Sequence, residues 1–576
     1  MKTARTLRLV AHLSLTTGSL TAASLNAASL GAVLAASVLL PACADENDPG
    51  TWVKRLDDPA QRPQAIKRLA QFFDDAMSKS EKNRDDPQVK GLLDQIAEPL
   101  AKQYTAGNLD EKTRKDLIKV LADMRDPRTG PALAKALNEY EPGKNDEDVK
   151  YAAQAVKGMA EDGKLADQNL IDALWNCFSK FQASKAKSIN LVQDLHDAVL
   201  TVKSPSYATK ALDKLSAPVD PKIPEQSLDQ IQFWQRTAIQ VLKELKYGPA
   251  ARPLVTMMLT PSKRDLFATA SSALMAIPKE AEPLLIAALK GTDPDFAKLE
   301  AMWDQKSYQM MIADALAWIS RPAGRDAALA ALDAADNDGN RAGIAQTLYR
   351  YPSDPRVVPA FLAAYKRIPD SSDNALIGGN PHVPLILAAA NLYDTSLCDW
   401  LLNEIATAKG DEKDATALLG LSSAMKIMSP QQAGNVGKAV ARDGTPRESD
   451  MYKLANGVTQ KCGTDASCYV KVLNDPIPSS PPTANMAAIK AAYMAAIYGN
   501  AATRRELVNV IERVRDGGAR LSVAQAILHL SPQGDVNTAV ALEKIVDADA
   551  KTGNKAVMSD DDALAKVALM LRSRAM

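Results

Sequence analysis

The sequence predicts an all-α fold in which antiparallel helix pairs stack side by side into a solenoid. Apolar residues recur every three or four positions along much of the chain, which is the period of one helix face. The helix-pair pattern then returns about thirty residues further on, a spacing typical of stacked helical units. Hydrophobic residues make up 46% of the chain but aromatic residues only 5%, which suits closely packed helices. No run of alternating β-branched residues indicates a strand.

The clearest repeat unit spans residues 247–292. A first helix follows Gly248 and Pro249, and its apolar residues lie on one face. A second helix begins near Phe267 and ends at Pro278, because proline cannot continue a helix. Neither helix can bury its apolar stripe alone. The core must therefore form between neighbouring units, as it does in a solenoid.

Six segments along the chain align with one another and give the repeat its register. They are residues 130–138, 207–216, 252–260, 282–290, 325–333 and 356–364. From Arg252 to Glu282, Arg325 and Arg356 the steps are 30, 43 and 31 residues. These steps suit helix-pair units that carry insertions in some of their loops.

One series near the start of the folded chain resembles a HEAT repeat. It reads Leu-x-Asp-Pro-x-x-Arg-x-x-Ala-x-x-x-Leu, at Leu56, Asp58, Pro59, Arg62, Ala65 and Leu69. In HEAT-like proteins the Asp-Pro pair starts a helix, with Asp as the cap and Pro at the first helical position. The resemblance implies a HEAT-like or armadillo-like solenoid of stacked antiparallel helix pairs.

Related helix starts recur further along the chain. A capping residue precedes proline at Asp126, Ser204, Asp293, Asp354 and Ser429. The family's arginine is displaced at two of these starts, since Arg128 and Arg356 follow proline directly. The repeats are therefore divergent, and the series of them carries the resemblance.

The first 42 residues predict an export signal. Lys2, Arg5 and Arg8 form a positive region, and an apolar region precedes Leu40-Pro41-Ala42-Cys43. These four residues resemble the lipobox of bacterial lipoproteins, which implies lipid attachment at Cys43 after cleavage. Acyl chains on Cys43 would anchor the protein in a membrane. Secretory cleavage without lipidation and an uncleaved membrane anchor are the alternatives.

The remaining chain divides by composition. Residues 43–50 form a short acidic tether, and residues 51–473 hold the HEAT-like helical repeats. Residues 474–484 form a proline-rich linker, which is either an ordered loop or a hinge. Residues 485–576 return to the helical pattern, and we expect them to continue the solenoid.

Two cysteines near the linker predict a local disulfide. Cys462 and Cys468 lie about one short turn apart, and an oxidising compartment favours their bonding. Asp465 is a candidate cap for the helix that follows. A metal pair is the alternative, although the further ligands that zinc needs are not nearby. Cys177 and Cys398 lie in apolar helical patterns, which favours buried free thiols.

Three motifs of penicillin-binding enzymes occur in the chain but do not fit together. They are Ser423-Ala-Met-Lys426, Lys551-Thr552-Gly553 and Ser372-Asp373-Asn374. The Ser-Asp-Asn motif precedes the Ser-x-x-Lys motif, the reverse of the family order, and no strand is expected at the Lys-Thr-Gly motif. We therefore predict no catalytic residue and no enzymatic activity.

The sequence offers no metal site either. Apart from His12, which lies in the signal, the histidines are His196, His382 and His529, and no two have zinc-ligand spacing. His382 lies in a Gly-rich loop over residues 370–385, which forms either part of a binding site or a surface excursion. The acidic run over residues 559–562 is expected to cap the last helix. No metal and no cofactor are expected.

Charge excludes a nucleic-acid partner. Beyond residue 42 the chain carries 66 basic and 69 acidic residues, a net charge of −3, and no basic patch is evident. We expect a lipid-anchored scaffold or protein-binding module at the outer membrane, facing the periplasm, with a protein or peptide as partner. A secreted or surface-exposed protein is the alternative location. A structural envelope protein without a discrete ligand, or an enzyme framed by helical repeats, is the alternative function.

Overall fold

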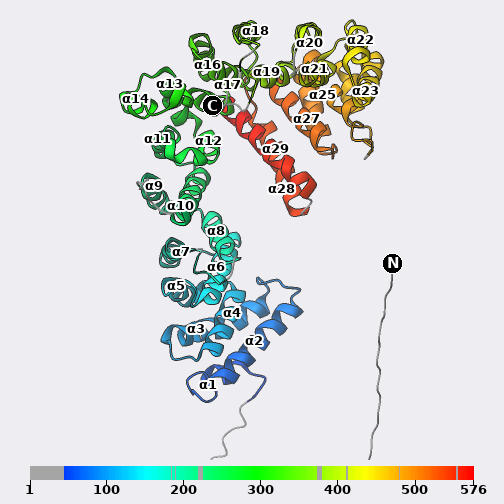
Figure 1. Cartoon of the computed structure of the whole chain (residues 1–576). Coiled ribbons are helices and arrows are strands. Elements are labelled where there is room, and N and C mark those ends of the chain that lie inside the picture. The colour runs from blue at the N-terminus through cyan, green and yellow to red at the C-terminus, as the bar shows by residue number, and fades with distance from the viewer. Residues whose placement is uncertain are drawn as a thin grey trace, which may run out of the picture.

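The predicted all-α class is confirmed in the computed structural model of the chain. The structure describes residues 45–576 except 183, 188–189, 218–224, 371, 373–378, 410–412, 479 and 553–554. Over this part of the chain it contains α-helices α1 to α29, six short 3-10 helices and no strand. The chain forms three successive stretches (Figure 1): an arm (residues 49–300), a crosspiece (308–462) and a return (466–574).

The arm is built from two layers of helices. The outer layer holds α1 (Pro49–Arg55), α3 (Pro87–Ala106), α5 (Gly130–Asn138), α7 (Gln168–Lys180), α9 (Tyr207–Ser216), α11 (Ala251–Met258) and α13 (Pro278–Lys290), with α14 (Pro294–Glu300) beside them. The inner layer holds α2 (Arg62–Lys79), α4 (Glu111–Met124), α6 (Asp146–Glu161), α8 (Asn190–Val202), α10 (Glu225–Glu244) and α12 (Phe267–Met275). Each inner helix contacts the next inner helix, so the apolar core runs between the layers.

The crosspiece and the return keep this alternation. The inner helices are α15 (Tyr308–Ile319), α17 (Asp338–Ala345), α19 (His382–Ala389), α21 (Lys413–Ile427), α23 (Pro446–Cys462), α25 (Met486–Tyr498), α27 (Gly517–His529) and α29 (Lys555–Arg574). The outer helices are α16 (Pro322–Ala334), α18 (Val357–Arg367), α20 (Ser396–Thr407), α22 (Ala433–Asp443), α24 (Ala466–Val472), α26 (Ala501–Ile511) and α28 (Val536–Thr552). The 3-10 helices are η1 (Pro127–Thr129), η2 (Gly248–Ala250), η3 (Pro261–Leu266), η4 (Asp304–Lys306), η5 (Leu348–Arg350) and η6 (Ala390–Leu392).

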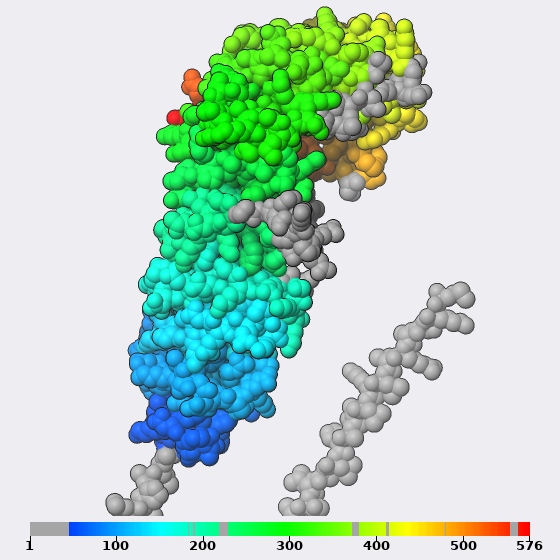
Figure 2. All heavy atoms as spheres, turned by 60° about the vertical axis from the view of Figure 1, so that its left-hand side comes forward, coloured from blue at the N-terminus to red at the C-terminus, as the bar shows by residue number. Residues whose placement is uncertain are grey.

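The return runs back beneath the crosspiece. In Figure 1, α25, α27 and α29 lie along the inner side of the crosspiece, and α29 contacts α12 and α15. Figure 2 shows the same fold-back in space-filling form, with the orange residues of the return lying beneath the crosspiece. The inner helices of the return therefore cover inner helices of the crosspiece, and in the arm they reach only its last inner helix, α12, among the described contacts.

Arg574, the last residue of α29, fastens the return to the crosspiece. Its guanidinium donates to the carbonyl oxygens of Leu528 at 2.7 Å and Ser531 at 3.0 Å, which lie at the end of α27. It also donates to the carbonyl oxygen of Arg350 at 2.8 Å and the hydroxyl of Ser320 at 2.9 Å, both in the crosspiece. Cations at helix C-termini satisfy the last carbonyl groups and the negative end of the dipole. Burial lowers the pKa of Arg574 to about 9.

Lys490 of α25 plays the same role deeper in the core. It is fully buried, and its ammonium donates to the carbonyl oxygens of Lys426 and Met428 at the end of α21. Burial lowers its pKa to about 7, because an ammonium removed from water loses hydration. The return is thus joined to the crosspiece through basic side chains that cap helix ends.

The predicted Asp-Pro starts act as caps in several units. Asp126 accepts from the backbone N–H of Arg128 at 2.9 Å, and Asp293 accepts from Asp295 at 3.0 Å and Phe296 at 3.3 Å. The first unit differs, since α2 begins at Arg62, three residues after Pro59. Asp58 instead caps the preceding turn, accepting from Ala60 at 2.9 Å. Arg62 of the motif donates to the carbonyl oxygen of Leu56 at 2.8 Å and so holds this turn against the helix.

The displaced arginines join successive units of the outer layer. Arg128 pairs with its own capping Asp126 at 2.7 Å and with Asp94 of the preceding outer helix at 2.6 Å. Arg356 does the same, pairing with Asp354 at 2.8 Å and with Asp326 at 2.7 Å. One local motif therefore makes the same bridge in the arm and in the crosspiece.

One capping prediction was wrong. Residues 559–562 lie inside α29, which begins at Lys555, so the acidic run does not start the helix. The first turn of α29 contains no acidic residue. The residues before the acidic run favour a helix. The helix therefore begins earlier, at Lys555, and the candidate cap falls inside it.

Candidate binding grooves

The largest of the three main hollows among the described residues lies between α2 and α4, at the free end of the arm. It has a volume of about 730 Å³. Ile66, Phe73 and Val120 give it an apolar floor. Six exposed charged residues surround that floor: Lys67, Asp74, Lys112, Asp116, Lys119 and Asp123. The groove thus presents mainly charged side chains of both signs, over apolar residues that are themselves mostly buried.

These charges lack partners where neighbouring inner helices have them. Arg114 of α4 pairs with Asp148 of α6, and Lys115 of α4 pairs with Glu147 at 3.4 Å. Lys157 of α6 likewise approaches Asp197 of α8 at 3.7 Å. No ion pair among the described residues joins α2 to α4. The face of α4 that looks toward α6 is therefore electrostatically matched, and the face that looks toward α2 is not.

Charges of both signs alternate along α4 in this groove. Lys112 and Asp116 belong to the first half of the helix, and Lys119 and Asp123 belong to the second half. Partial desolvation raises the pKa of Asp123. Among the nearby charges, Lys119 opposes this rise most, Asp74 adds to it, and Arg84 and Arg125 oppose it. Asp74 and Asp123 are thus close enough to interact. Both ends of the groove therefore carry a lysine and a carboxylate of α4.

A second hollow of about 600 Å³ lies between α23 and the predicted linker. The linker is a loop between α24 and α25, and Ile477 and Pro478 form one wall of this hollow. Leu454 and Val458 form the other wall. Gly457 opens the hollow between them, because a Cβ atom there would meet no atom within 4 Å.

A third hollow of about 580 Å³ lies where the crosspiece meets α27. Tyr351, Pro352, Tyr393 and His529 contribute to its lining. The ring of Tyr393 packs between His529, at a centroid distance of 4.3 Å, and Tyr493, at 5.2 Å. Burial and the charge of Arg574 lower the pKa of His529 to about 4, so its imidazole is neutral near pH 7. This hollow lies against the packed junction between crosspiece and return.

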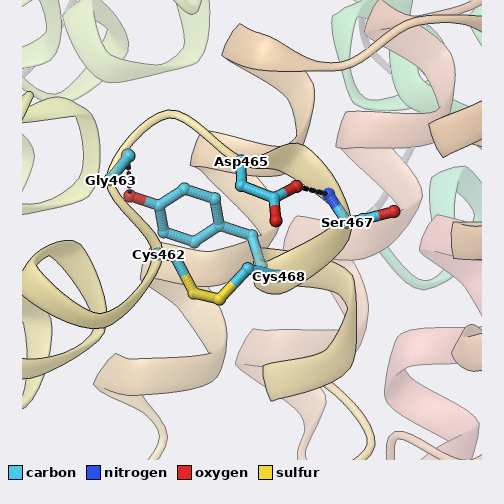
Figure 3. The surroundings of a disulfide bond; sticks show 6 residues. Cys462, Gly463, Asp465, Ser467 and Cys468 are labelled. Carbon is cyan, nitrogen blue, oxygen red and sulfur yellow. Dashed lines mark hydrogen bonds between the residues drawn. A yellow bond between two sulfur atoms is a disulfide. The ribbon is translucent and has the colours of Figure 1, made fainter.

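Cys462 and Cys468 form a disulfide in the structure, shown in Figure 3. Their Cα atoms are 5.3 Å apart, and the bond joins the end of α23 to α24. Between them, Gly463 has a positive φ of 57°, which glycine adopts readily. Asp465 caps α24 as predicted, accepting from the backbone N–H of Ser467 at 2.9 Å. The disulfide therefore closes the turn where the chain leaves the crosspiece.

The other two cysteines described by the structure are buried free thiols, as predicted. Burial raises the pKa of Cys398 to about 12 and that of Cys177 further still. A thiol held neutral in this way is a poor nucleophile. These residues contribute packing to the core.

The penicillin-binding motifs stay apart. Ser423 and Lys426 lie on α21, and the hydroxyl of Ser423 is buried. Lys551 lies near the end of α28, which Figure 1 shows well separated from α21. Ser372 donates to Asp338 at 2.8 Å, while Asp373, Asn374 and Gly553 lie outside the described residues. No nucleophile with a neighbouring base emerges from the described members of these motifs.

The histidines serve local packing. His382 is buried and stacks on Tyr365 at a centroid distance of 4.1 Å, and its Nε2 lies 3.2 Å from the Tyr365 carbonyl oxygen. His196 Nε2 lies 2.7 Å from the side-chain oxygen of Gln240. Within the described residues, no three His, Cys, Asp or Glu side chains form a group that could hold a metal ion.

The predicted signal and Cys43 lie outside the described residues. In the remainder, no helix is both long enough and apolar enough to span a bilayer. No known protein family matches the sequence, and no curated protein is similar to it.

Proposed function

We propose that this protein is a lipid-anchored scaffold of the cell envelope that binds a protein or peptide partner through a HEAT-like solenoid. The observation that carries the proposal is the α2–α4 groove, which is lined by exposed charges and across which no ion pair of the described residues joins the two helices. Charges that a fold leaves unmatched beside an apolar floor are available to a partner. Nucleic acid is a poor fit, because the groove carries as many carboxylates as lysines.

Three features support the HEAT-like solenoid. Inner and outer helices alternate along the described chain, and like helices contact along each layer. Asp-Pro pairs cap several unit starts. Arg128 and Arg356, which lie in units far apart in the sequence, make the same bridge to an acidic residue of the preceding outer helix. A repeated unit joined to its neighbours by repeated contacts is the defining property of a solenoid.

The lipid anchor and the envelope location rest on the sequence of the first 43 residues. Acylation at Cys43 would attach the chain to the outer membrane, and the periplasm would oxidise Cys462 and Cys468. The first helix, α1, begins at Pro49, six residues after Cys43. The arm, with its α2–α4 groove, would then lie close to the membrane surface.

Mass spectrometry of the membrane-extracted protein tests this function. The wild type should carry acyl groups on an amino-terminal Cys43, and Cys43→Ala should be unmodified and absent from the membrane fraction. Affinity capture of the lipidated protein should then recover a specific envelope protein. An unmodified soluble wild type would contradict the anchor, and repeated capture without a specific partner would contradict the scaffold.

A further inference from the structure

The hollow between α23 and the linker has aliphatic walls that a ligand can reach. Its volume is about 600 Å³, which is the size of a pocket for a whole small molecule. Leu454 of α23 and Ile477 of the linker are half-buried, and the linker adds the exposed residues Pro476, Pro478 and Pro481. None of the described residues that line the hollow is aromatic. Aromatic ligands gain most from aromatic partners, so these walls favour an aliphatic ligand.

The charged side chains at this hollow do not select the charge of a ligand. On α23, Lys453 pairs with Asp450 at 3.1 Å. The other two charged lining residues have opposite signs, with Lys461 on α23 and Asp475 on the linker. All four side chains are exposed. Burial of apolar surface, which has no preferred direction, therefore decides what enters the hollow.

One buried polar group in the lining has no hydrogen-bond partner among the described residues. It is the hydroxyl of Thr483, a residue that is only 8% exposed. The carbonyl oxygen of Thr483 accepts from the backbone N–H of Met486 at 3.0 Å, so the residue is held at the start of α25. A buried hydroxyl without a partner destabilises the protein, and an acceptor oxygen on a ligand would satisfy it.

Gly457 widens the hollow, although the packing of α23 does not require a glycine there. A Cβ atom at Gly457 would meet no atom within 4 Å. Glycine inside a helix is also less favourable than alanine, because it loses more conformational freedom on folding. The open space beside Gly457 therefore belongs to the hollow and could be filled without a clash.

We propose that this hollow binds an acyl group, which is an aliphatic chain that ends in a carbonyl or carboxylate. The chain would lie over Gly457, between Leu454 and Ile477. An oxygen of the acyl group would accept a hydrogen bond from the hydroxyl of Thr483. Aliphatic walls and a hydroxyl that lacks an acceptor match the two parts of this ligand. The inference is independent of the proposed scaffold function, which concerns the α2–α4 groove.

Isothermal titration calorimetry with octanoate, decanoate and dodecanoate, each below its critical micelle concentration, tests the proposal. Affinity should rise about fourfold with each added methylene group, because each one buries a similar apolar area. A lysophospholipid with a dodecanoyl chain presents the same acyl group as an ester. Binding of both compounds would point to membrane lipid as a source, and binding of dodecanoate alone would point to free fatty acid.

Gly457→Leu should fill the hollow and abolish the binding of dodecanoate. Gly91→Leu in α3 is the matched control, because a Cβ atom at Gly91 also meets no atom within 4 Å and Gly91 does not line the hollow. Leucine favours a helix more than glycine does, so both variants should melt at or above the temperature of the wild type. Only Gly457→Leu should lose dodecanoate.

Thr483→Val removes the hydroxyl while keeping the shape of the side chain. The affinity for dodecanoate should fall about fivefold, because the ligand loses one hydrogen bond. Dodecyltrimethylammonium has the same chain but no acceptor oxygen, so it should bind the wild type and Thr483→Val equally. An affinity that does not rise with chain length, undiminished binding by Gly457→Leu, or an unchanged affinity of Thr483→Val for dodecanoate would each overturn the proposal. None of these results would affect the capture of a protein partner.

Discussion

The arm and the return use the same alternation of helices but treat their inner faces differently. In the arm, the inner helices α2 and α4 leave an open groove with six exposed charged residues. In the return, α25, α27 and α29 bury their inner faces against the crosspiece, and Lys490 and Arg574 point at helix ends there. The inner faces that close on the chain place basic side chains at helix ends, whereas the charged inner faces of α2 and α4 stay exposed.

The two regions also differ in how they satisfy charge. Besides its apolar core, the arm joins its units through pairs between oppositely charged side chains, such as Lys210 with Asp172 at 2.6 Å. At the closed junction, Lys490 and Arg574 instead donate to carbonyl and hydroxyl oxygens. Removing a cation from water without a carboxylate partner lowers its pKa, as at both residues. The junction should therefore be sensitive to mutation and to pH.

Arg574→Ala should have the largest effect on stability, because it acts at the closed junction between return and crosspiece. The substitution removes all the hydrogen bonds that tie the end of α29 to α27 and to the crosspiece, and it leaves partly buried carbonyl groups unsatisfied. We expect the free energy of unfolding to fall by about 4 kcal/mol in urea denaturation. Limited proteolysis should then cleave near α29 first. Lys112→Ala, an exposed change in the open groove, is the control and should have little effect.

His529→Gln should change how the stability of the protein depends on pH. The pKa of His529 is about 4 in the folded protein and lies near 6.5 in an unfolded chain, so the unfolded state binds more protons between these values. The wild type should therefore lose stability as pH falls from about 6.5 to 4, by up to about 3 kcal/mol relative to the variant. Urea titrations at several pH values would measure this difference. Parallel curves for the two proteins would show that His529 is not buried at the junction.

The double variant Cys462→Ser/Cys468→Ser should loosen the turn between crosspiece and return. The bond closes a loop with a sequence separation of six residues. Removing it restores chain entropy to the unfolded state and should cost about 2 kcal/mol. Thermal denaturation with and without a reducing agent provides the measurement. Reduction should lower the melting temperature of the wild type and leave that of the variant unchanged.

Arg128→Ala and Arg356→Ala should have the smallest effects, and similar ones. Each arginine makes a bridge between successive outer helices, one in the arm and one in the crosspiece. Such pairs near the surface contribute little, so each melting temperature should fall by only about 1 °C. A much larger loss in one variant would mean that the outer layers of the two regions are not built alike.

The helical class could be predicted because it depends on local spacing. The period of apolar residues and the prolines at 249, 261 and 278 locate helix boundaries within residues 247–292, where the structure has α11, α12 and α13. Reliance on local spacing also explains the wrong capping prediction. Residues 559–562 resemble a helix cap in isolation, but the helix already begins at Lys555.

The fold-back and the groove could not be predicted in the same way. Arg574 meets Ser320 across 254 positions of sequence, and the apolar pattern of residues 485–576 is the same as that of units that do not fold back. The lysines and carboxylates of α2 and α4 look like ordinary solvent-exposed residues. Only the absence of ion pairs between these two helices in the described structure distinguishes them from the paired charges of α4 and α6.

Lysine acetylation of the folded protein, followed by mass spectrometry, tests the contrast between open arm and closed junction most directly. Lys67, Lys112 and Lys119 are exposed, whereas Lys490 is fully buried. The three groove lysines should react at the rate of free surface lysines, and Lys490 should react only after unfolding. Rapid acetylation of Lys490, or slow acetylation of the groove lysines in the free protein, would contradict the account.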